Sequence, residues 1–239
     1  MVHRQRVSRG DTLRIRRFRA ASTRRRSSRR TTRGQTLVEF ALVFPLFLTL
    51  LLSVIEFAFL FNAILAVQFA AQNAALIAAE IGDVPGVGTN LPIADCAILR
   101  EVERDIGAPA SAAQIQSVDI VWADALTGLS KGSGTTTTTT YTRGGSKNCV
   151  YPDGTSATVP YGFAAPNNYP PVARCNFQTP TTSTCPSTAG LSHTGGPDFI
   201  AVTIRYTHVF KTPLGTFVPS GSNSLTFSRS NAVRMEPIF

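Results

Sequence analysis

The stretch that decides the fold is Gln35–Ile81, QTLVEFALVFPLFLTLLLSVIEFAFLFNAILAVQFAAQNAALIAAEI. Its 47 residues contain no glycine and one proline, Pro45. Phe40–Ile55 is uncharged, with 12 Leu, Ile, Val or Phe among 16 residues, and 23 more uncharged residues follow Glu56. About 20 apolar residues suffice to span a bilayer. We therefore predict a transmembrane helix, kinked near Pro45, that continues over residues 35–81 into an Ala-rich stalk.

A cleavable secretory signal is the competing interpretation of this segment. Its apolar region would run for about 7–15 residues and end at a small-residue cleavage site. Here the apolar pattern continues for about twice that length, so the pattern favours a membrane anchor.

Positive charge is concentrated before the apolar segment. Residues 1–34 hold 13 Arg and one acidic residue, a net charge of +12, whereas the remainder of the chain carries −3. Arginine runs can bind nucleic acid, but a basic segment ahead of a span is also typical of a cytoplasmic N-terminus. We therefore expect residues 1–34 to be a disordered cytoplasmic leader, the lipid bilayer to be the partner, and no nucleic acid to be bound.

A short motif joins the basic leader to the apolar helix. The run Gly34-Gln35-Thr36-Leu37-Val38-Glu39-Phe40 resembles the cleavage motif of type IV prepilins, in which a glycine precedes the cut and a glutamate is the fifth mature residue. Cleavage after Gly34 would make Gln35 the first residue and Glu39 the fifth. Glu39-Phe40 also resembles the Glu-Tyr pair of the tight-adherence pilins, with Phe in place of Tyr.

The longer run from Arg33 to Leu46 resembles the start of TadE-like proteins of tight-adherence pilus systems, and Ile55-Glu56-Phe57 also fits that pattern. The resemblance implies a minor pilin or pseudopilin that acts in pilus assembly and adhesion. It also implies a prepilin peptidase, other pilin-like subunits and the pilus assembly platform as partners. The alternative is an uncleaved single-pass anchor that presents an adhesive or scaffolding domain, as in TadG-like relatives.

Three residues of this region have simpler explanations. Glu39 can be a first-turn acid stabilised by the helix dipole, although the resemblance implies that it meets the new N-terminal amine of a neighbouring subunit. Gly34 can be a loop glycine before the helix. Glu56 lies about 25 Å further along the helix, near the opposite interface. There we expect a solvated or snorkelling carboxylate rather than a specific partner, with an assembly role as the alternative.

Residues 82–239 predict an extracytoplasmic α+β domain with a small antiparallel sheet. A short helix is expected from Ile93 to Ile106, with Asn90 as a candidate cap, Pro92 as an early helical position and an apolar face at four-residue spacing. Period-two alternation predicts about three strands, near residues 118–123, 200–210 and 225–235. Residues 124–197, rich in Gly, Pro, Thr and Ser, are expected to form a long irregular loop, with Thr135–Thr140 as its flexible tip.

Four cysteines follow the span, so they share one side of the membrane. Two disulfides are expected there, and the sequence leaves all three pairings open. We favour Cys175–Cys185, a short local loop, with Cys96–Cys149 linking the second helix to the start of the long loop.

Nothing in the sequence points to catalysis or to a cofactor. No paired cysteine spacing indicates a metal site. His193, Ser192 and Asp198 lie in a Gly-rich stretch, but no hydrolase signature or phosphate-binding loop accompanies them. We therefore expect a structural protein, without cofactor or small-molecule substrate, rather than an enzyme.

Overall fold

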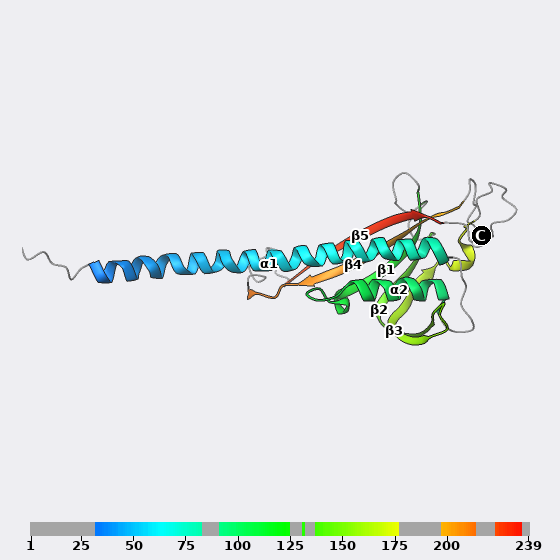
Figure 1. Ribbon diagram of the computed structural model, residues 1–239, viewed down its shortest axis with the longest axis horizontal. Helices are drawn as coiled ribbons and strands as arrows, with labels where there is room; N and C mark the ends of the chain where they lie inside the picture. Colours follow the sequence, from blue (N-terminus) through cyan, green and yellow to red (C-terminus); the bar gives the residue numbers. More distant parts are fainter. Residues whose placement is uncertain are drawn as a thin grey trace, which may run out of the picture. The chain divides into compact units, whose positions relative to one another are not determined.

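The structure is a computed structural model that describes residues 32–82, 91–124, 131, 137–176, 197–213 and 223–235. The chain forms two compact units, Met1–Pro45 and Leu46–Phe239, which meet inside the first helix. Figure 1 shows the elements in chain order. The expected disordered leader falls on residues that are mostly outside the described part of the chain.

Helix α1 spans Thr32–Ile81, and it begins three residues before the predicted start. Within it, Gly34–Ile81 is long and apolar enough to cross a membrane. It is the one such helix in the described residues. Every side chain from Gly34 to Leu51 is exposed, and Glu56 is the first buried one along the helix. The predicted apolar helix is therefore present, and its covered part begins at a carboxylate.

Helix α2, Ile93–Asp105, confirms the second predicted helix. Pro92, expected as an early helical position, is instead the N-cap, the residue just before the first turn. The candidate cap Asn90 lies outside the described residues. The predicted apolar face is buried at Ala94, Ile98 and Val102. This face packs into the core of the domain.

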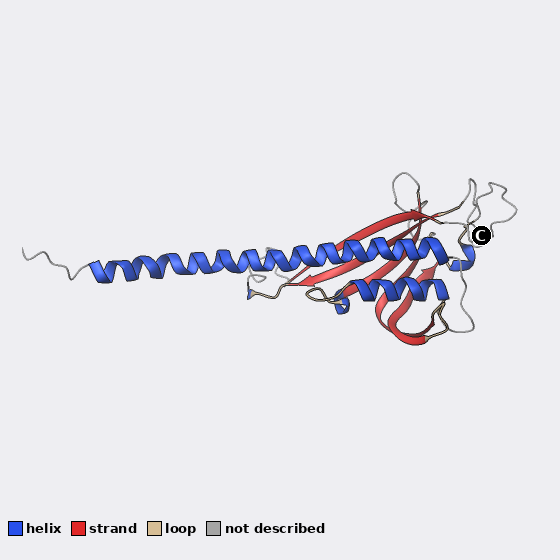
Figure 2. Cartoon of the chain, in the orientation of Figure 1, coloured by secondary structure: helices blue, strands red, loops and turns tan. Residues whose placement is uncertain are grey.

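The sheet, drawn in red in Figure 2, contains five antiparallel strands in the order β3-β2-β1-β4-β5. The strands span the following residues: β1, Ile115–Ala123; β2, Thr138–Val150; β3, Ser156–Asn167; β4, Phe199–Val209; β5, Ser224–Arg234. Short 3₁₀ turns precede β1, at Ala112–Gln114, and follow β3, at Pro171–Ala173.

The predicted strand count of three was wrong, because β2 and β3 form a hairpin inside the expected long loop. Among the described side chains of this pair, the deeply buried apolar ones are Tyr141, Cys149, Val159 and Tyr161, so the alternating apolar signal is sparse. Thr138–Thr140 belongs to β2 rather than to a flexible tip. Threonine is β-branched and favours strands, and this propensity prevails over the low-complexity pattern.

Both helices of the Leu46–Phe239 unit cover one face of its sheet (Figure 1). The part of α1 that packs there carries seven buried alanines and Val67, which allow a close approach to the strands. α2 adds Ile98, Leu99 and Val102, and β1 and β4 contribute their inward side chains. The stalk and the second helix therefore cover the sheet.

A disulfide joins Cys96 in α2 to Cys149 in β2. The favoured pairing is therefore present, although Cys149 ends a strand instead of beginning a loop. Cys175 is also disulfide-bonded, while Cys185 lies outside the described residues. Closing a 53-residue separation restricts the unfolded chain and so stabilises the folded domain.

Candidate functional site

The N-terminal motif is exposed on α1. Gly34 lies inside the helix rather than in a loop before it, and no atom would come within 4 Å of a Cβ at this position. The Gln35 side chain donates a hydrogen bond of 3.1 Å to Glu39 Oε1. Within the described residues, Glu39 has no cationic partner of its own. Packing within the chain therefore does not account for a glycine at position 34 or for a carboxylate at position 39.

Glu56 is held by the end of β4, 152 to 156 residues further along the chain. Its Oε1 accepts a bond of 2.9 Å from the backbone N–H of Lys211, and its Oε2 accepts one of 2.8 Å from that of Thr212. His208 Nε2 lies 3.4 Å from Oε1, and both side chains are buried. We call this arrangement the Glu56 clamp. The expectation that the Glu56 carboxylate would be solvated or would snorkel to the interface is therefore wrong.

The clamp satisfies a carboxylate that interrupts the apolar run of α1. A buried charge without partners is costly, whereas two backbone N–H donors offset most of that cost. The clamp fixes the end of β4 against one turn of α1. Two features of the sequence point to the clamp: Glu56 interrupts an apolar run, and His208 falls on the apolar face of a strand.

A second buried polar cluster joins α2 to the segment after β3. Arg174 and Asp95 form an ion pair at 2.7 Å, and both side chains are fully buried. Arg174 Nη1 donates to the Gly82 carbonyl at the end of α1, and Nη2 donates to the Tyr169 carbonyl. Asp95 also accepts a hydrogen bond from the Tyr141 hydroxyl of β2. One arginine therefore holds α1, α2 and the 169–176 segment together.

Tyr169 and Asp198 extend this cluster. The Tyr169 hydroxyl donates to Asp198 Oδ2 at 2.9 Å, and the same oxygen accepts from the Cys175 backbone N–H. Burial raises the pKa of Tyr169 well above its ordinary value, and the Asp198 carboxylate adds to this effect. The tyrosine therefore stays a neutral hydrogen-bond donor. Asp198, weighed above as part of a hydrolase, is a structural acceptor here, while Ser192 and His193 lie outside the described residues.

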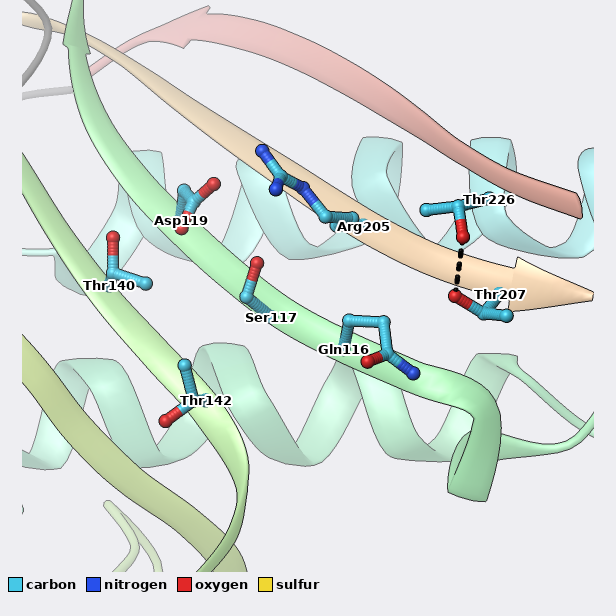
Figure 3. A pocket seen from close by; sticks show the side chains of 8 residues that line it. All are labelled: Gln116, Ser117, Asp119, Thr140, Thr142, Arg205, Thr207 and Thr226. Atoms are coloured by element: carbon cyan, nitrogen blue, oxygen red, sulfur yellow. Dashed lines mark hydrogen bonds between the residues drawn. The ribbon is translucent and has the colours of Figure 1, made fainter.

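An open polar groove of about 530 Å³ lies on the sheet face away from the helices (Figure 3). Four strands contribute to it, and hydroxyl groups dominate its lining, which comprises Gln116, Ser117, Asp119, Thr140, Thr142, Arg205, Thr207 and Thr226. Thr207 and Thr226 hydrogen-bond to each other across β4 and β5 at 2.8 Å. Asp119 is the carboxylate of the groove. Burial raises its pKa above the ordinary 3.8, against the opposing effects of Thr140 and Arg205.

The raised pKa of Asp119 predicts that ionisation of this carboxyl destabilises the folded protein in a pH-dependent way. A carboxyl whose pKa is higher in the folded state favours folding while it is protonated, and this contribution is lost as pH rises through that pKa. We therefore expect Asp119→Asn to raise the Tm of the detergent-solubilised protein at pH 7, and the gain to shrink as pH falls toward 4. Thermal unfolding followed by circular dichroism measures both.

Asp153→Asn is the matched control with the opposite sign. Hydrogen bonds from Thr155 lower the pKa of Asp153. Its contribution to stability is present at neutral pH and is lost as pH falls, so the variant should lower the Tm at pH 7. A Tm for Asp119→Asn at or below that of the wild type at pH 7 would contradict the prediction for Asp119.

In the residues that the structure covers, no group of three His, Cys, Asp or Glu side chains could hold a metal ion. The polar clusters there contain ion pairs and hydrogen bonds that join secondary-structure elements. The exposed motif at Gly34–Phe40 is a candidate for function, because its residues are not explained by packing within the chain.

Comparison with known proteins bears on this motif. No curated protein and no solved structure matches the chain significantly. A family model described as TadE-like protein matches residues 34–76, from the motif glycine through most of α1. The family expected from the motif is therefore the family that this segment matches, and the N-terminal helix is similar to that of TadE-like proteins over residues 34–76.

Proposed function

We propose that the chain is a minor pilin-like subunit of a tight-adherence pilus system, cleaved after Gly34 by a prepilin peptidase, with a non-catalytic role in pilus assembly and adhesion. The observation that carries this proposal is the TadE-like match, which begins at Gly34 itself. The Gly34 to Glu39 spacing agrees with it, as does the exposure of both residues on the helix.

The length of uncovered helix supports insertion in a membrane. Gly34–Ile55 contains 22 residues, among which none is buried by the domain. At about 1.5 Å per residue this segment is about 33 Å long, close to the thickness of a bilayer core of about 30 Å. The Glu56 clamp follows immediately, so we place the membrane surface at Glu56, with the domain of Leu46–Phe239 beginning to cover the helix there.

An apolar stripe continues along α1 after Glu56 on the side away from the sheet. It consists of Phe57, Phe61, Leu65, Phe69 and Leu76, which are each about half exposed or more. The stripe extends about 29 Å beyond the membrane surface proposed above, so lipid cannot cover all of it. Exposed apolar patches of this size favour a protein partner. Helices of neighbouring pilin-like subunits would cover the stripe.

The role proposed for Glu39 follows from its surroundings. A carboxylate at the edge of the bilayer core is costly unless it is paired. Glu39 lacks a cationic partner within the described residues. Cleavage after Gly34 would create an amine at Gln35, and a neighbouring subunit could bring that amine to Glu39. The leader, with its net charge of +12, would be removed in the same step.

Processing is the direct test of this proposal. We expect the protein extracted from membranes of cells with an active pilus system to have the mass of a chain that starts at Gln35. Gly34→Val should keep the leader, because a branched side chain blocks the peptidase. The helix has open space for a Cβ at this position, so the variant should still fold. Intact mass spectrometry measures both forms. A wild-type mass that includes the leader would favour the uncleaved anchor instead.

A further inference from the structure

Four side chains lie at the end of the β4–β5 hairpin where the two strands are connected, and we call them the hairpin base: exposed Val209, Lys211 and Leu225, and half-buried Phe210. Val209 pairs with Ser224 and His208 pairs with Leu225 at this end of the sheet. The Phe210 N–H donates to the Asn223 carbonyl and closes the ladder. Val209 and Leu225 are 40% and 41% exposed, and Lys211 is exposed as well.

The hairpin base lies beside Glu56. The Lys211 N–H is 2.9 Å from the Glu56 carboxylate, and Phe210 contacts the ring of His208 edge-on, with the ring centroids 5.6 Å apart. The uncovered apolar segment of α1 ends at Ile55. A helix that crosses a bilayer through this segment therefore brings the hairpin base to the level of the lipid headgroups.

The chemistry of the hairpin base fits a lipid interface better than a protein surface. Outside α1, the described residues include four exposed large apolar side chains, Phe163, Val172, Val209 and Leu225, and two of them are here. Leu225 shares the face of buried His208, whereas Val209, the next residue of β4, points to the opposite face. A protein partner would cover one face, while lipid can cover both. The Lys211 side chain is exposed, and an exposed ammonium near the membrane surface attracts anionic phosphates.

We infer that the hairpin base is a second membrane contact, in which Val209 and Leu225 enter the interfacial region and Lys211 binds anionic phospholipid headgroups. The inference rests on the membrane insertion of α1 that belongs to the proposed function. It is independent of cleavage and of pilus assembly. The contact would fix the tilt of the domain over the bilayer, because the domain would be held at two places instead of one.

Tryptophan quenching by brominated lipids tests the inference on the full chain in phosphatidylcholine–phosphatidylglycerol vesicles. We expect Leu225→Trp to be quenched at least about twofold more than Val172→Trp, by lipids brominated near the headgroup. Val172 is somewhat more exposed than Leu225, at 51% against 41%. It lies two residues before Arg174, which binds the Gly82 carbonyl, and Gly82 is about 39 Å along α1 from Glu56. The chain has a single native tryptophan, Trp122, which pairs with Ile200. Ile200 lies about 30 Å along β4 from Val209, so the fluorescence of Trp122 is the same background in every variant.

Lys211→Glu tests the charge. The backbone N–H of Lys211 holds Glu56, so a side-chain change leaves the clamp intact. In the Leu225→Trp background it should reduce quenching in vesicles with phosphatidylglycerol and have little effect in phosphatidylcholine alone. Equal quenching of Leu225→Trp and Val172→Trp in protein that floats with the vesicles would overturn the inference. Failure to float would instead contradict the insertion of α1 and the proposed function with it.

Discussion

Arg174→Met is expected to lower the free energy of unfolding by about 3–5 kcal/mol, the range for breaking a buried ion pair by removing one partner. Methionine fills much of the same volume but cannot neutralise Asp95, whose side chain has no exposure to water. The variant also loses the bonds from Arg174 to the carbonyls of Gly82 and Tyr169. The end of α1 would therefore lose its polar attachment to the rest of the domain.

Urea unfolding of the full chain in mild detergent, followed by circular dichroism, measures this loss. Arg100→Met is the matched control, because the Arg100–Asp153 pair is half exposed and water replaces it readily. Its effect should be much smaller. The double variant Asp95→Asn/Arg174→Met should recover part of the lost stability, since it removes the uncompensated charge while keeping an acceptor for Tyr141. A loss for Arg174→Met no greater than that for Arg100→Met would show that this cluster does not stabilise the domain.

The sequence was sufficient to predict elements whose pattern is local. The apolar run predicts α1, four-residue spacing predicts the buried face of α2, and alternation predicts β1, β4 and β5. The hairpin of β2 and β3 was missed because threonine, glycine and proline hide its few apolar positions. Strand pairing there depends on backbone hydrogen bonds to β1, which composition does not encode.

Partners that are distant in the chain could not be predicted in the same way. Glu56 and His208 each interrupt an apolar pattern, but no spacing rule links residues 152 positions apart. Asp95 and Arg174 also form a pair that no spacing rule links, and Arg174 lies in the segment expected to be loop. The motif at Gly34–Phe40 is different. It could be recognised from its residues and their spacing alone, and its side chains are exposed in the structure. Both facts agree with proposed partners that are other molecules.

Glu39→Gln is expected to leave membrane insertion and cleavage intact but to prevent the subunit from joining the pilus or its initiation complex. Glutamine keeps the shape of glutamate and can still accept the hydrogen bond from Gln35. It cannot pair with an ammonium group, so a neighbour's N-terminal amine would stay uncompensated near apolar lipid. If Glu39 served the helix dipole alone, the variant would cost less than about 1 kcal/mol and assembly would continue.

The choice of control decides how this experiment is interpreted. Glu56→Gln is unsuitable, because the new side-chain NH₂ would face the backbone N–H of Lys211 or of Thr212 and disturb the clamp within the subunit. Glu80 is an exposed carboxylate near the end of the same helix, so Glu80→Gln removes one charge from α1 without breaking a contact described above. Co-purification of tagged subunit with sheared pili should fall to background for Glu39→Gln and stay at the wild-type level for Glu80→Gln. Equal recovery of both variants would mean that Glu39 is an ordinary helix-end acid. The proposed pairing between subunits would then have to be abandoned, even if cleavage after Gly34 is observed.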